Sequence, residues 1–90
     1  MTVIKKDGRK QPFIPHKIIT SAIGTARDVG VNLSAREGEI LSQDVAKVLI
    51  GLRGEDGVTS SYEIRMILAI TMKRFGYPSA ATEYLLDALE

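Results

Sequence analysis

Apolar residues recur at intervals of three and four in four stretches of the chain, which is the spacing of one face of an α-helix. The first stretch predicts a helix over about Pro15–Val29. Capping-box patterns at Ser34–Glu37 and Ser60–Glu63 open a second and a third helix, and Pro78 begins a fourth. The residues expected to face the core are Ile18, Ile19, Ala22, Ile23, Ala26, Val29, Ile40, Leu41, Val45, Val48, Leu49, Leu52, Ile64, Ile67, Leu68, Thr71, Phe75, Ala81, Tyr84, Leu85, Ala88 and Leu89.

The N-terminus lacks this spacing and instead contains two short extended runs separated by Asp7–Gly8. An Asp-Gly pair between extended runs is typical of a two-residue type I′ hairpin turn. The predicted register places Lys6 opposite Arg9, Lys5 opposite Lys10, Ile4 opposite Gln11 and Val3 opposite Pro12. Two successive like-charge pairs would then repel each other across the strands. A bound anion would relieve that repulsion, although lysines also protect exposed sheet edges from aggregation.

Together these elements predict an α+β fold in which an N-terminal β-hairpin caps a four-helix bundle. Val58–Thr59 is a candidate third strand of the small sheet. The length of 90 residues favours a single domain that spans residues 1–90.

Composition narrows the classes of function. The chain has no cysteine and a single histidine, His16, which argues against disulfides, a zinc ribbon, thiol catalysis and a histidine-based metal site. It also lacks the GxxxxGK[ST] phosphate loop, the GxGxxG pattern and a Ser/His/Asp set, so we expect no enzyme. No apolar run approaches the about 20 residues that a membrane-spanning helix needs, and charges begin at Lys5, unlike a secretory signal. We therefore expect a cytoplasmic protein with no membrane partner.

Charge is unevenly distributed along the chain. Residues 1–17 contain five Lys or Arg and one Asp, a sum of +4, whereas the other 73 residues contain seven basic and ten acidic side chains, a sum of −3. A local positive field of this kind attracts anions. Lys17, Ser61 and Arg65 lie at the starts of predicted helices, where free amides also favour an anion. Each also has a simpler explanation: Lys17 as a solvated surface lysine, Ser61 as a helix cap and Arg65 as the partner of a nearby acidic side chain.

The order of these features resembles a known module, the ATP-cone. The resemblance is carried by the run Val3–Arg9, then Pro12–Phe13 and Lys17–Ile18, and later by Val58–Ser60 and Gly76–Pro78. Each element is weak alone, but together they cover essentially the whole chain in the family's order and spacing.

The resemblance implies a four-helix bundle capped by a small sheet, which binds ATP or dATP as an allosteric signal without hydrolysing it. Such domains occur mostly in ribonucleotide reductases and in the repressor of reductase genes, so a reductase or another domain of a parent protein is an implied partner. A Mg²⁺ ion carried by the nucleotide is compatible with this. By analogy, Lys5, Lys6 and Lys17 would contact the phosphates, Val3 and Ile4 the adenine, Gln11 the region of the base, and Ser61 and Arg65 the nucleotide from a helix start.

The sequence departs from the family at two places. Ile14 replaces a polar residue, and Leu86–Asp87 replace an aromatic-plus-basic pair, so a cation is lost and a carboxylate gained. These departures motivate an alternative, a degenerate cone that acts in protein interaction or homo-oligomerisation. A third hypothesis, nucleic-acid binding through the hairpin, is disfavoured because the hairpin offers no stacking aromatic except Phe13 and the remaining chain is acidic.

Overall fold

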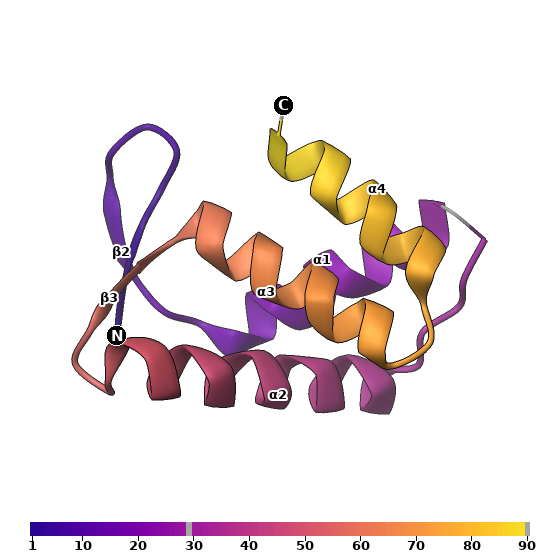
Figure 1. Ribbon diagram of the computed structural model, residues 1–90, viewed down its shortest axis with the longest axis horizontal. Helices are drawn as coiled ribbons and strands as arrows, with labels where there is room; N and C mark the ends of the chain where they lie inside the picture. Colours follow the sequence, from indigo (N-terminus) through magenta and orange to yellow (C-terminus); the bar gives the residue numbers. More distant parts are fainter. Residues whose placement is uncertain (29, 90) are drawn as a thin grey trace.

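The computed structural model describes residues 1–28 and 30–89, except for the side chains of residues 84 and 87–89. The described part contains, in chain order, β1 (Thr2–Ile4), β2 (Lys10–Pro12), α1 (Pro15–Asp28), α2 (Ala35–Arg53), β3 (Val58–Ser60), α3 (Ser61–Arg74) and α4 (Pro78–Leu89). The α+β prediction is confirmed, with a small mixed sheet and four helices. The sheet lies at one end of the helices, beside the start of α3 and the end of α2 (Figure 1).

The sheet has the strand order β2-β1-β3, so that β1 is central. β1 runs antiparallel to β2 and parallel to β3. The candidate third strand is thereby confirmed, and it runs directly into α3 because Ser60 both ends the strand and caps the helix. The start of α3 is therefore held against the sheet.

The predicted register of the hairpin is wrong by one residue. Ile4 lies opposite Lys10, and Val3 lies opposite Gln11. The loop contains three residues instead of two: the Gly8 amide donates to the Lys5 carbonyl at 2.9 Å, and within the turn only Gly8 has a positive φ, of 88°. A type I turn followed by a left-handed glycine gives this longer connection.

The shifted register replaces the two predicted like-charge pairs by one, Lys5 opposite Arg9. The Lys5 amide donates to the Arg9 carbonyl at 2.7 Å, so these two residues close the loop. Arg9 also forms an exposed ion pair with Asp7, with 2.6 Å between Nε and Oδ2. Repulsion across the strands is therefore smaller than the sequence suggested, and support for a bound anion comes from the surroundings of the hairpin.

The core lies between the four helices, with α1 packed on α2 and α3 packed on both α2 and α4. Leu41, Val45 and Leu49 form the central row of α2, at the spacing of four expected for one helix face. The buried apolar cluster consists of Ile18, Ala22, Ala26, Leu33, Leu41, Val45, Leu49, Leu68, Ala69, Met72, Ala80 and Ala81.

Three positions expected in the core are exposed. Ile40 and Leu52 flank the central row of α2, and Leu52 exposes 64% of its surface at the last turn. Phe75 follows the end of α3 and is 41% exposed. The buried face of these helices is therefore narrower than the apolar face that the sequence predicted. Of the other predicted core positions, residue 29 and the side chains at 84, 88 and 89 lie outside the described part.

The two capping-box patterns have different outcomes. At α2 both halves form: the Ser34 hydroxyl accepts from the Glu37 amide, and the Glu37 carboxylate accepts from the Ser34 amide, each at 3.1 Å. At α3 the Ser60 hydroxyl accepts from the Glu63 amide at 3.0 Å, but the Glu63 carboxylate turns to other partners. None of the described helices is long and apolar enough to cross a bilayer.

Candidate functional site

Two adjoining pockets lie where the sheet meets the first turns of α1 and α3. The smaller has a volume of about 140 Å³ and the larger about 420 Å³. They share three lining residues, Lys5 from the hairpin and Ser61 and Arg65 from α3. A small-molecule site usually has about 300–1,000 Å³, so the smaller pocket accommodates only part of such a ligand.

The smaller pocket has apolar walls, and three cations, Lys5, Lys17 and Arg65, also line it. Its walls come from β1, the segment between β2 and α1, and the inner faces of α1 and α3. The apolar lining residues are Val3, Pro12, Phe13, Ile14, Ile18 and Ile64. Among these walls Gln11 supplies one amide, which can both donate and accept a hydrogen bond. This combination suits a flat apolar ring that has polar groups on one edge.

Charged side chains form a larger share of the lining in the larger pocket. Lys5, Lys6, Arg9 and Arg65 line it, and Asp7 is its one carboxylate, already paired with Arg9. Hydroxyl groups come from the start of α3, where free backbone amides and the helix dipole also favour negative charge. This pocket suits a group with several negative charges.

All eight residues predicted from the resemblance line one or both pockets, although nothing in the structure tests whether they bind nucleotide. Val3 and Ile4 do not share a pocket: Val3 is buried beside the smaller one, whereas Ile4 lines the larger one. Adjacent residues of a strand point to opposite faces, and Val3 and Ile4 accordingly face different pockets. Lys17 lines the smaller pocket and Lys6 the larger.

Sequence reasoning missed several lining residues. Tyr62 is 49% exposed and lines the larger pocket, which no pattern in the sequence indicated. Ile18 and Ile64 line the smaller pocket from two helices that are distant in sequence. Of the two departures from the family, Ile14 lies in the wall of the smaller pocket, Leu86 is exposed, and the side chain of Asp87 lies outside the described part.

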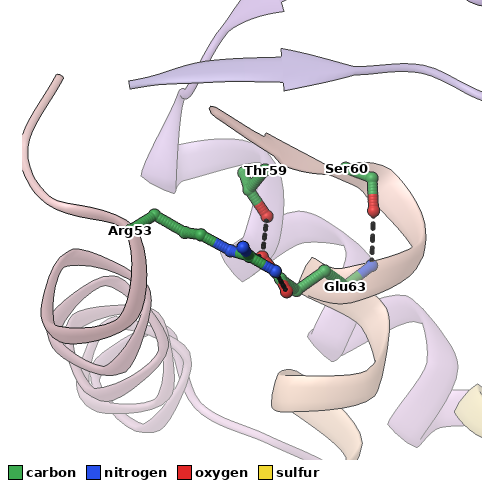
Figure 2. Close-up of polar contacts among 4 residues, drawn as sticks. All are labelled: Arg53, Thr59, Ser60 and Glu63. Atoms are coloured by element: carbon green, nitrogen blue, oxygen red, sulfur yellow. Dashed lines mark hydrogen bonds and ion pairs between the residues drawn. The ribbon is translucent and has the colours of Figure 1, made fainter. Parts of the chain in front are cut away.

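Behind the shared wall, Glu63 connects the end of α2 to β3 and α3 (Figure 2). Its carboxylate accepts from the Arg53 guanidinium through both oxygens, at 3.1 and 2.6 Å. The Thr59 hydroxyl donates to the same carboxylate at 2.6 Å, and Thr59 is itself buried in β3, opposite Val3. The hydrogen bonds from Arg53 and then Thr59 hold the pKa of Glu63 below its usual value of 4.5.

We expect Glu63 to make the stability of the protein depend on acid pH. Because its pKa is lower in the folded than in the unfolded protein, the stabilisation is complete above pH 4.5 and is lost as the pH falls through the lower folded value. Glu63→Gln should therefore lower the free energy of unfolding by about 1 kcal/mol at pH 7. Urea unfolding between pH 3 and 7 should show that difference shrinking below pH 4.5.

Glu55→Gln is the matched control, because Glu55 is an exposed carboxylate in the loop after α2. It should leave the unfolding curve unchanged at both ends of the pH range. A constant difference between wild type and Glu63→Gln over all pH values would contradict the ionic role of Glu63. Glu37 contributes in the same direction in both proteins, since a hydrogen bond from Tyr77 and others from Ser34 lower its pKa.

The described residues hold no group of three or more His, Cys, Asp or Glu side chains that could bind a metal ion. Their fold and pockets define a small α+β domain in which a pocket with apolar walls adjoins a more polar one, and cations line both. The sequence matches the ATP cone domain family over residues 1–86, nearly the whole chain, and the protein therefore belongs to that family. Domains of this family are regulatory and bind ATP or dATP as effectors. No curated protein matches the sequence.

Proposed function

We propose that this chain is a regulatory domain that binds ATP or dATP and senses their levels without catalysing a reaction. The observation that carries the proposal is the pair of adjoining pockets, both lined by cations and one of them with more apolar walls, which share Lys5, Ser61 and Arg65. A nucleoside triphosphate has the same two-part chemistry. Family membership supports the class of ligand.

In this proposal the base enters the smaller pocket and the phosphates lie in the larger one. Gln11 meets the polar edge of the base, while Lys5 and Arg65 lie at the junction and Lys6 binds further along the phosphate chain. Hydrogen bonds between cationic side chains and phosphate oxygens are stronger than neutral ones. Any Mg²⁺ arrives with the nucleotide, and phosphate oxygens and water supply its ligands.

Binding also provides a means of regulation. The pockets are built from the hairpin and the first turns of α1 and α3, so a bound nucleotide holds these three elements together. A ligand shifts a conformational equilibrium by as much as its affinities for the two states differ. We infer that a partner, such as a ribonucleotide reductase or another cytoplasmic protein or domain, responds to the position of these elements.

We expect ATP and dATP to raise the melting temperature of the chain. At a concentration of about 100 times Kd, a ligand that binds only the folded protein adds about 2.7 kcal/mol, which corresponds to about 10 °C or more for a domain of this size. Calorimetry with ATP, dATP, adenosine and inorganic tripolyphosphate measures the contribution of each half of the ligand. Unchanged melting in millimolar ATP and dATP would exclude this function for the chain.

A second candidate is a cone that has lost its ligand and serves in protein interaction or homo-oligomerisation. It is favoured by exposed apolar side chains away from the pockets: Ile70 on α3 and Leu86 on α4 are 57% and 52% exposed. Sedimentation analysis separates the two candidates. A mass that rises with protein concentration and does not respond to nucleotide supports the second, whereas a monomer that binds ATP excludes it.

A further inference from the structure

We propose that Arg53 is a positioning residue for the phosphate side of the site, because it holds and neutralises the Glu63 carboxylate behind the wall that the phosphates contact. This inference rests on the proposed function. It assigns a role to the end of α2, a segment that lines neither pocket.

The first turn of α3 has two competing electrostatic demands. Glu63 is its one acidic residue, and a carboxylate there is stabilised by the positive end of the helix dipole. The same turn provides Ser61 to both pockets, and Arg65 follows two residues after Glu63. A phosphate drawn to this helix start would therefore meet a negative charge within the same turn, and like charges at such distances repel.

Arg53 resolves this competition by its geometry. It is the last residue of α2, and its guanidinium reaches across to α3 and contacts both Glu63 oxygens, at 3.1 and 2.6 Å (Figure 2). Thr59 holds one of the same oxygens from β3 at 2.6 Å. With three hydrogen bonds fixing the carboxylate, Glu63 itself lines neither pocket. Its side chain is only 24% exposed, so solvent screens the pair incompletely.

The pair also joins the site to α2. If α2 moved away from α3, Glu63 would lose its counter-charge and the helix start would become less favourable for an anion. Binding free energies are reciprocal, so a bound anion favours the arrangement in which the end of α2 contacts α3. The affinity for phosphate thus depends on the position of a helix that the ligand does not touch.

The test compares Arg53→Met, Glu63→Gln and the double variant with wild type, using isothermal calorimetry with ATP and with inorganic tripolyphosphate. Arg53→Met leaves Glu63 uncompensated, and we expect about three- to tenfold weaker binding at low salt and a smaller difference at high salt. Glu63→Gln should bind as tightly as wild type or more tightly, even though it is less stable. The double variant should recover wild-type affinity within about twofold. Melting temperatures recorded alongside separate affinity from stability.

Arg74→Met is the matched control. It removes one positive charge and breaks an ion pair between α3 and α2, the pair with Asp44, but at the opposite end of α3. It should leave the affinity for both probes unchanged within about twofold. Where Arg53→Met is too unstable to measure, Arg53→Lys replaces it. Lysine keeps the positive charge but cannot contact both Glu63 oxygens in the same way. Its affinity should be lower than that of wild type, by less than the loss expected for Arg53→Met.

The outcomes are distinct. Weaker binding by Glu63→Gln and the double variant, in proportion to their loss of stability, would overturn the inference and leave a purely structural role. Equal affinities in all variants would overturn it as well. Wild type that binds tripolyphosphate but not ATP would exclude the proposed function while the ordering of the variants still decides the inference. Wild type that binds neither probe overturns both.

Discussion

Lys5→Glu should lower the affinity for ATP at least about a hundredfold, the largest loss we expect from a single change at the surface. Lys5 is the one hairpin residue that lines both pockets. The substitution removes a charge-assisted contact and places a negative charge beside the phosphates, and each of these effects is worth about 1.5–3 kcal/mol. Every tenfold in affinity corresponds to about 1.4 kcal/mol. Calorimetry gives the affinity, and circular dichroism shows whether the helices are retained.

Lys10→Glu provides the matched control. Lys10 lies on the neighbouring strand opposite Ile4 and lines neither pocket, so the same change in net charge acts only at a distance and through solvent. We expect less than about a threefold loss there at physiological salt, and about tenfold for Lys6→Glu at the tip of the hairpin, which lines only the larger pocket. Equal losses at positions 5 and 10 would mean that overall charge, and not the pocket, governs binding.

The helices and the sheet could be predicted from the sequence because local rules determine them. Spacings of three and four place Leu41, Val45 and Leu49 on one face of α2. The side chain of Ser34 accepts a hydrogen bond from a free amide at the start of that helix. These effects act within one or two turns of a helix. The fold class followed from them, and the described structure confirms it.

The register of the hairpin could not be predicted in the same way. An Asp-Gly pair fits a two-residue turn and also fits the last two positions of a three-residue loop, and only the φ values in the structure separate the two. Asp7 does not adopt the positive φ that a type I′ turn demands, so the loop takes in Lys6 and every pair along the strands shifts by one. The shift places Ile4 opposite Lys10 and Val3 opposite Gln11.

The residues that line the pockets could not be predicted from local sequence patterns either. Ile18 and Ile64 line one pocket because α1 and α3 both start at the sheet, which no pattern within either segment indicates. The contacts of the Glu63 side chain could not be predicted from a local pattern either. Its sequence pattern predicts a local capping contact with Ser60, but a guanidinium ten residues away provides charge and two hydrogen bonds, and the carboxylate turns to Arg53.

Gly57→Ala should destabilise the protein by about 2–3 kcal/mol, the largest effect on stability that we expect from adding one methyl group. A Cβ at position 57 would lie 2.0 Å from the Arg53 carbonyl oxygen and 2.7 Å from its carbonyl carbon, and backbone atoms cannot yield as a flexible side chain can. The Gly57 amide donates to the Gly54 carbonyl at 3.1 Å, and its own carbonyl accepts from the Thr2 amide at 3.0 Å. Relief of the clash would therefore open the turn after α2 and disturb the start of β1.

Gly51→Ala is the natural comparison for this change. Position 51 lies within α2, and an added Cβ there meets no atom within 4 Å, so alanine should stabilise the protein by up to about 1 kcal/mol through its higher helix propensity. Urea unfolding of the two variants should thus move in opposite directions from wild type. Because the turn at Gly57 also positions Arg53, the Gly57 variant should bind tripolyphosphate more weakly at temperatures where it is fully folded. Wild-type stability in Gly57→Ala would mean that the turn can open at no cost, and that the end of α2 is not fixed against α3 in the way that the Arg53–Glu63 contact requires.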